Sequence, residues 1–210
     1  MALSLCFIAS IIYGNNFHLS TELLNKMEQK YGKSARSRLV AWEELVVTDN
    51  SQTDLEKLEK VNNFFNQMEF VDDIVQWKTE DYWATPIEFL GTQAGDCEDF
   101  TIAKYFTLKA MGVKEENLNL TYVKALTYNV HHMVLAYYST PGSEPLILDN
   151  IITVIKPSSQ RTDLLPIYSF NGTGLWLAKQ RGRGKLAGSS SRLQRWQDLM
   201  QRMAKDNLGQ

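Results

Sequence analysis

The spacing of apolar residues changes halfway along this chain of 210 residues, and the change limits the fold more than any other feature. Up to Gly112, apolar side chains recur every three or four positions, which is typical of helices. From Leu118 onwards, short runs rich in β-branched and aromatic residues are separated by turn residues, which is typical of strands. We therefore expect an α+β fold in which N-terminal helices pack on an antiparallel sheet.

Local signals place the ends of the expected elements. Thr53 and Thr85 each precede a glutamate by three residues in capping-box form, and Asp96 is a third candidate N-cap. Together with the apolar spacing, these signals predict helices over 20–31, 34–47, 54–68, 86–91 and 97–111. Strands are expected over 118–125, 130–138, 146–148, 151–155 and 168–172.

The two ends of the chain differ in composition from the body. Residues 1–15 are expected to be a remnant of a secretion signal or a first element of the fold, because their apolar run is too short to span a bilayer. Residues 16–180 form the expected single domain, and residues 181–210 form a basic loop and a C-terminal helix. The net charge of −2 gives no reason to expect nucleic acid as a partner, although residues 179–210 alone carry +6.

Cys97 is the first candidate for chemistry. The chain has two cysteines, so it can form at most one disulfide or leave a thiol free to react. Cys97 lies in the first turn of an expected helix, where free backbone amides and the helix dipole favour the nucleophilic thiolate. A cysteine at a helix start is also commonly structural, and this alternative stays open at this point.

A histidine and a carboxylate are expected to meet on the sheet. His131 and His132 open one expected strand, and Asp149 follows the next one, so antiparallel pairing would bring them together. A thiol, an imidazole base and a carboxylate that orients the imidazole form the relay of a cysteine hydrolase. Neighbouring residues on a strand face opposite sides, but both faces are apolar here, so alternation does not choose between His131 and His132.

Three carboxylates flank Cys97, at Asp96, Glu98 and Asp99. Their charge should raise the pKa of the thiol, and three acids are more than a helix start needs. A hard cation bound by oxygen ligands would cancel the repulsion, and Ca²⁺ fits better than Zn²⁺ because no cluster of cysteine and histidine is present in the sequence. The plain alternative is that these acids only stabilise the start of the helix.

Taken together, the motifs resemble those of the bacterial transglutaminase-like cysteine proteinases. The elements that carry the resemblance are GDCEDF at 95–100, AKYF at 103–106, HMVLAYY at 132–138 and LDN at 148–150. The resemblance extends from about residue 20 to residue 178. Any one of these elements alone would be weak, and their combination is specific.

The resemblance implies a papain-like, transglutaminase-type fold with Cys97 as nucleophile, His132 as base and Asp149 as the orienting carboxylate. It also implies a Ca²⁺ site that includes Asp96, Glu98 and Asp99. The implied activity is that of a periplasmic endopeptidase, without direct membrane insertion, that cuts a large surface adhesin near its N-terminus at a dialanine-type site and promotes biofilm dispersal. The implied partners are that adhesin and an inner-membrane receptor that sequesters the protease when cyclic di-GMP is abundant.

Two other functions stay open on the sequence. Acyl transfer to an amine would use the same three residues, and a non-catalytic binding module would keep Cys97 as a buried thiol. A zinc hydrolase is less favoured, because the adjacent histidines lack the helical spacing of the HExxH motif.

Overall fold

A computed structural model describes residues 17–47, 52–177 and 184–206 of the chain. The expected remnant of a secretion signal at residues 1–15 lies outside these ranges, and so do residues 181–183 of the basic loop. Within the described ranges, no helix is long and apolar enough to cross a membrane.

The expected helices of the first half are confirmed, with small shifts at their ends. They are α1 (Thr21–Tyr31), α2 (Lys33–Val47), α3 (Asp54–Phe65), α5 (Pro86–Thr92) and α6 (Cys97–Ala110). Capping boxes stand at the N-termini of α3 and α5, at Thr53 and Thr85. Each threonine hydroxyl accepts a hydrogen bond from the backbone amide of the glutamate three residues on, and the side chain of that glutamate accepts one from the backbone amide of the threonine. A similar box stands at Asp96, where Asp99 takes the place of the glutamate.

Three short elements between α3 and α6 have no counterpart among the predicted ones. They are β1 (Glu69–Phe70), α4 (Asp73–Gln76) and β2 (Ala94–Gly95). Strands β1 and β2 pair in parallel, so the residues just before Cys97 are tied to the segment that leads into α4. Elements of two to four residues are too short to show a period in the sequence.

The second half of the chain forms an antiparallel sheet of seven strands in the order β6-β5-β4-β3-β7-β8-β9. Its strands are β3 (Leu118–Ala125), β4 (Val130–Tyr137), β5 (Leu146–Leu148), β6 (Lys156–Pro157), β7 (Leu164–Phe170), β8 (Leu175–Leu177) and β9 (Leu186–Gly188). Short 3₁₀ helices η1 (Glu115–Asn117), η2 (Ser158–Gln160) and η3 (Ser190–Arg192) join neighbouring elements.

The strand predicted over 151–155 is wrong. This apolar run forms a bend, in which Ile151 is 39% exposed and Val154 is 64% exposed. The backbone amide of Ile151 donates to the side chain of Asp149 instead of to a neighbouring strand. No residue of the run is buried and none pairs with a strand, and the next strand begins at Lys156.

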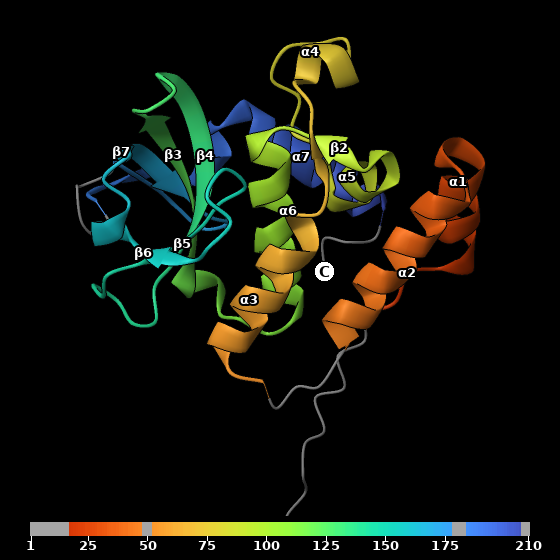
Figure 1. The fold of residues 1–210 in the computed structure, drawn as a ribbon, viewed down its shortest axis with the longest axis horizontal. Coiled ribbons are helices and arrows are strands. Elements are labelled where there is room, and N and C mark those ends of the chain that lie inside the picture. The colour runs from red at the N-terminus through yellow and green to blue at the C-terminus, as the bar shows by residue number, and fades with distance from the viewer. Residues whose placement is uncertain (1–16, 48–51, 178–183, 207–210) are drawn as a thin grey trace, which may run out of the picture.

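Helix α6 lies between the other N-terminal helices and the sheet (Figure 1). Nine of its residues are buried, and its side chains join those of α2, α3 and α5 on one side and those of β3 and β4 on the other in one core cluster. This position explains why apolar residues fill much of α6. A helix held on both sides gives its first turn, with Cys97, a fixed place relative to the sheet.

The C-terminal part of the chain packs on the same core. Helix α7 (Gln194–Lys205) buries Trp196, Leu199 and Met203, and the Trp196 ring stacks on Phe106 with ring centroids 5.7 Å apart. Its basic side chains pair with acids of the body: Arg202 lies 2.6 Å from Glu88, and Arg195 lies 2.7 Å from Asp81. Two of the eight basic residues of the tail are therefore paired with acids of the body.

Candidate active site

The thiol of Cys97 lies at the start of α6, directly after β2. Its residue is half-buried, and Sγ donates a hydrogen bond to Glu98 Oε2 at 2.7 Å. Burial raises the pKa of the Cys97 thiol well above its usual value, and the charges of Glu98 and Asp96 raise it further. A hydrogen bond from the Met133 backbone acts in the opposite direction. The acids thus oppose ionisation of the thiol, which is the direction expected from the sequence.

The first turn of α6 is joined to strand β4. The hydroxyl of Thr101 donates to the carbonyl of Cys97 at 2.8 Å and lies 3.0 Å from the carbonyl of Met133. The Met133 backbone also contacts the thiol. Thr101 and this contact therefore hold Cys97 beside Met133, which is the residue after His132.

His132 and Asp149 are in direct contact inside the protein. Strands β4 and β5 are antiparallel neighbours, with Leu135 opposite Leu148, so the start of one lies by the end of the other. The distance from His132 Nε2 to Asp149 Oδ1 is 2.7 Å, and both residues are buried. His131 is exposed and stacks on Tyr122, with ring centroids 5.3 Å apart. The structure therefore separates the two histidines, which alternation alone did not.

Asp149 remains a carboxylate in this setting. Burial raises its pKa, but hydrogen bonds and opposite charge from His132, with further hydrogen bonds from the Ile151 amide and Arg161, bring the pKa well below the usual range. An ionised carboxylate can only accept, so the proton in the 2.7 Å contact belongs to His132 Nε2. In a neutral imidazole, Nδ1 is then free to accept a proton.

Three carboxylates meet beside this site. One ligand oxygen from each of Asp73, Asp96 and Asp99 lies within 4.8 Å of the others, and Glu98 with Asp96 and Cys97 forms a second group of the same kind. Burial raises the pKa of Asp73 to about 6 and that of Asp96 to about 10, and it raises the pKa of Asp99 as well. Repulsion from nearby carboxylates, with Glu98 acting on all three, adds to each shift.

The donor set fits a hard cation. All three groups are oxygen donors, and Asp73 Oδ1 is buried without a hydrogen-bond partner. Among the described residues, no lysine or arginine forms an ion pair with Asp73, Asp96 or Asp99. Asp96 and Asp99 also serve in the capping box of α6, so the helix-start explanation accounts for part of their role but not for Asp73.

Two backbone amides of a neighbouring segment hold these acids. Ala84 N donates to Asp99 Oδ1 at 2.7 Å, and Tyr82 N donates to Asp73 Oδ2. The segment is itself fastened by α7, because Arg202 donates to the Tyr82 hydroxyl at 2.8 Å. The C-terminal helix thus contributes to the shape of the acid cluster.

Sequence reasoning missed three residues at this site: Asp73, Lys104 and Arg161. Asp73 is one of two adjacent aspartates in a segment without a recognisable element, and Arg161 is one polar residue among several in a loop. Lys104 belongs to a motif of the resemblance, but nothing in the sequence indicated that its Nζ would lie 3.1 Å from the carbonyl of Asp149.

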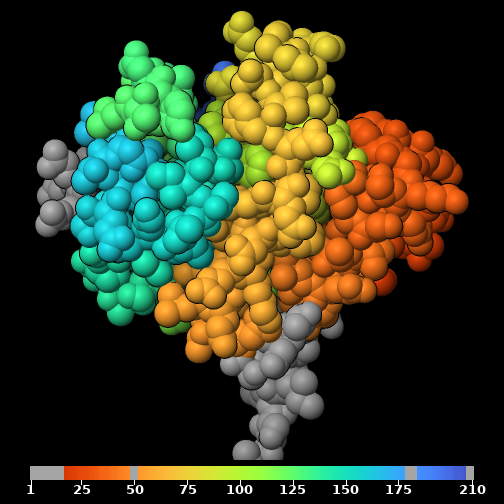
Figure 2. Space-filling model, in the orientation of Figure 1, coloured from red at the N-terminus to blue at the C-terminus, as the bar shows by residue number. Residues whose placement is uncertain are grey.

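Two segments flank the approach to the first turn of α6. Figure 2 shows a notch in the surface between the α4 segment, in yellow, and the β3–β4 turn, in green. The N-terminal end of α6 lies between the same two segments in Figure 1. Both segments expose large apolar side chains. On β1 and α4 these are Phe70, Ile74 and Val75, and around the β3–β4 turn they are Leu126, Tyr128 and Val130.

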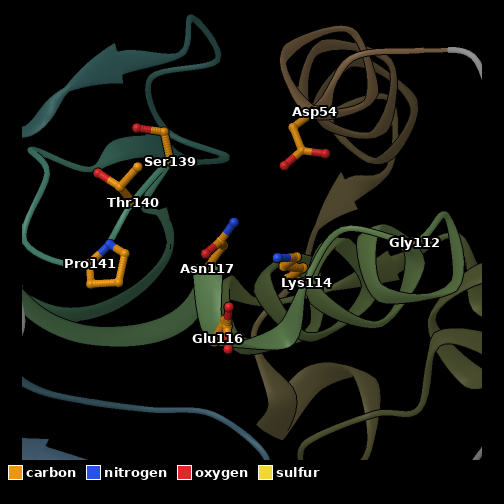
Figure 3. Close-up of a pocket in the computed structure, with 8 residues that line it drawn as sticks. All are labelled: Asp54, Gly112, Lys114, Glu116, Asn117, Ser139, Thr140 and Pro141. Carbon is orange, nitrogen blue, oxygen red and sulfur yellow. The ribbon is translucent and has the colours of Figure 1, made fainter.

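A separate pocket of about 440 Å³ lies away from this site (Figure 3). Its lining includes Asn117, which precedes β3, and Ser139, which follows β4. These residues lie at the ends of β3 and β4 that are far from His132. Among the described residues of the lining, no nucleophile is paired with a base. We therefore place the chemistry at Cys97 and not in this pocket.

Comparisons with known proteins find a family and solved structures that are similar to most of this chain. Residues 30–178 match the family described as bacterial transglutaminase-like cysteine proteinase, BTLCP. The EGTA-treated structure of LapG from Legionella pneumophila is 47% identical with a TM-score of 0.77, and the match covers 88% of this chain and 97% of that one. The calcium-bound structure of the same protein is 47% identical with a TM-score of 0.74, covering 88% of this chain and 99% of that one. The curated proteins gave no match.

Proposed function

Because the chain belongs to the bacterial transglutaminase-like cysteine proteinase family, and is therefore a cysteine protease, we propose that it is a calcium-dependent endopeptidase that acts through Cys97, His132 and Asp149. The observation that carries this proposal is the buried contact between His132 and Asp149, next to the strand residue that touches the thiol. The same arrangement argues against a binding module, which would have no use for a buried imidazole held in one tautomer.

In the proposed reaction, His132 takes the proton of Cys97 and the thiolate attacks the scissile carbonyl. We expect the backbone amide of Cys97 to donate to the oxyanion that develops, because the amides of Glu98 and Asp99 already donate to Asp96 in the capping box. His132 then gives its proton to the leaving amine, and water releases the acyl group from Cys97. Asp149 keeps the imidazole in the tautomer that each of these transfers needs.

Asp73, Asp96 and Asp99 would hold the calcium ion, with Glu98 as a further oxygen donor nearby. When bound, Ca²⁺ supplies positive charge that offsets the repulsion among these acids and next to the thiol. LapG from Legionella pneumophila, which has been solved in a calcium-bound and an EGTA-treated form, supports this assignment.

For the substrate and the partner we propose the assignments of the LapG type. The protease cuts a large surface adhesin near its N-terminus at a dialanine-type site in the periplasm, and a LapD-type receptor of cyclic di-GMP sequesters it. The identity of 47% with LapG over 88% of the chain supports this proposal. The notch over α6, flanked by exposed apolar segments, suits an extended peptide with small side chains at the cut.

The test uses the two cysteines of the chain as a matched pair. We expect Cys97→Ala to abolish cleavage of an adhesin N-terminal fragment that contains a dialanine site, with unchanged circular dichroism, and Cys6→Ala to retain it. EGTA should stop the wild-type reaction, and added Ca²⁺ should restore it. Sequencing of the product separates proteolysis, which gives a new N-terminus, from incorporation of an amine label. Cleavage by Cys97→Ala would overturn the assignment.

A further inference from the structure

The carboxylate of Asp149 contacts two buried side chains, the imidazole of His132 and the guanidinium of Arg161. Its Oδ1 contacts His132 at 2.7 Å, and its Oδ2 accepts from Arg161 Nη2 at 2.6 Å. The side chains of Asp149 and Arg161 are 0% and 2% exposed. The mechanism described above uses the first contact and gives no role to the second.

Arg161 is held in turn by a second carboxylate. Its Nε lies 3.0 Å from Asp163 Oδ1 and its Nη2 lies 2.8 Å from Asp163 Oδ2, a two-pronged contact that fixes the plane of the guanidinium. The remaining nitrogen, Nη1, is buried without a hydrogen-bond partner. The contacts with Asp149 and Asp163 therefore fix the orientation of the Arg161 guanidinium.

We propose that Arg161, held by Asp163, is a positioning residue for the triad, which acts through Asp149 to keep the proton of His132 on Nε2. The inference rests on the proposed function, since it concerns the same three residues. A buried carboxylate without a cation beside it tends to take up a proton. A protonated Asp149 could donate to Nε2, and the imidazole proton would then sit on Nδ1, where it blocks the uptake of the thiol proton.

The main chain of Asp149 is held independently of Arg161. Its carbonyl accepts from Asn66 Nδ2 at 3.0 Å and from Lys104 Nζ at 3.1 Å. Removal of the guanidinium should therefore leave the carboxylate with only His132 and the Ile151 amide as partners, without moving the backbone. This separation allows the effect on catalysis to be measured apart from an effect on the fold.

The experiment compares Arg161→Gln and Arg161→Lys with Arg36→Gln, a control at a half-exposed ion pair with Glu28 on the N-terminal helices. With the adhesin fragment and Ca²⁺, we expect Arg161→Gln to lower kcat about 10- to 100-fold with KM nearly unchanged, less than the roughly 10⁴-fold loss when a triad carboxylate is lost. Arg161→Lys, which keeps the charge, should recover part of kcat, and Arg36→Gln should match the wild type.

The ring nitrogens of His132 give a readout that does not depend on activity. In protein with ¹⁵N-labelled histidine, we expect the Nε2–H tautomer in the wild type and in Arg36→Gln, and a mixture of tautomers in Arg161→Gln. If Arg161→Gln folds and keeps both kcat and the tautomer, the proposal is wrong. If it does not fold, Asp163→Asn decides: unchanged kcat and tautomer in that variant would overturn the proposal too.

The two proposals can fail separately. Cleavage by Cys97→Ala would overturn the proposed function, whatever the tautomer of His132 in Arg161→Gln. Loss of cleavage in Cys97→Ala together with unchanged kcat and tautomer in Arg161→Gln would overturn only the role of Arg161.

Discussion

At the scale of single residues, burial and hydrogen-bond partners distinguish two adjacent histidines between which strand alternation did not choose. His132 is 3% exposed and bound to Asp149, whereas His131 lies at the surface on Tyr122. Two identical side chains in neighbouring positions therefore differ in their chemistry, because only the imidazole of His132 is held in one tautomer.

This difference gives a matched pair of substitutions. His132→Asn should lower kcat by roughly 10⁴-fold, because the base is lost, and His131→Asn should leave it within about twofold of the wild type. Cleavage of the adhesin fragment, measured at equal concentrations of folded protein, checks both. Equal losses in the two variants would contradict the assignment of His132.

Lys104 predicts a dependence of stability on pH. Burial lowers its pKa from 10.5 to about 7 in the folded protein. Between these values the unfolded chain binds more protons than the folded one, so the free energy of unfolding rises with pH from about 7 to about 10 and falls as the pH drops back.

The check is the slope of the unfolding free energy between pH 7 and pH 10, from denaturant titrations. We expect the wild-type slope to exceed that of Lys104→Met by up to about 1.4 kcal/mol per pH unit. Lys60→Met, at an exposed position of α3, should keep the wild-type slope. A wild-type slope in Lys104→Met would show that this amine is charged in the folded protein.

How far the sequence predicted the site depends on how local each contact is. Cys97 and its flanking acids are adjacent in the chain, and the motifs of the resemblance carried His132 and Asp149. Arg161 is 12 residues from Asp149 and Lys104 is 45 residues from it, and no periodic pattern connects such pairs. Their roles arise only when loops and helices pack.

At the scale of elements, α4 shows what a short helix can contribute. It places Asp73 with Asp96 and Asp99, although Asp73 is 23 positions before Asp96 in the chain. Its neighbour Asp72 is exposed and makes no side-chain cap bond in this helix. The two adjacent aspartates therefore differ in whether they can reach a cation.

We expect Asp73→Asn to weaken Ca²⁺ binding at least about tenfold, which removes about 1.4 kcal/mol or more of the stabilisation by calcium. Without calcium the same variant should be at least as stable as the wild type at pH 7, because the buried charge of Asp73, whose pKa is about 6, is gone. Melting temperatures with EGTA and with Ca²⁺ test both signs. Asp72→Asn should behave as the wild type, and an equal effect of the two substitutions would contradict this ligand set.

The sequence predicted most of the long elements, although it found only the end of β7, and it missed the short elements apart from β5. Helices of 7 to 15 residues show apolar periods, α3 and α5 add capping boxes, and β3 and β4 are rich in β-forming residues. Strands β1, β2 and β6 have two residues each and exist because a neighbour offers hydrogen bonds. The predicted strand at 151–155 was wrong because an apolar run needs a covering surface to become a strand.

At the scale of the whole molecule, α7 joins the two halves. The ring of Trp196 contacts Tyr105 and Phe106 of α6 and Phe170 of β7, with centroid distances from 5.3 to 5.9 Å. The antiparallel sheet and the helical half were predictable from the order of the patterns, but this closure by the C-terminal helix was not.

Trp196→Ala should therefore destabilise the whole fold by about 3–5 kcal/mol, through one cooperative transition in which helix and sheet signals are lost together. Leu177→Ala, at a side chain that is 58% exposed on β8, should change the stability by less than about 0.5 kcal/mol. Denaturant unfolding followed by far-ultraviolet circular dichroism and tryptophan fluorescence tests this. Two separate transitions in the wild-type protein would show that α7 does not join the halves.

The close spacing at the start of α6 also limits how this protein can be re-engineered. Cys97 and Asp99 share one turn, a Cβ at Gly95 would come within 2.8 Å of the Asp99 Cβ, and Ala84 and Asp73 complete the surroundings. A variant designed to lack the proposed dependence on calcium cannot be made by exchanging these residues one at a time. The stretch 95–99 would have to be transplanted as a single part, together with the segments that carry Asp73 and Ala84.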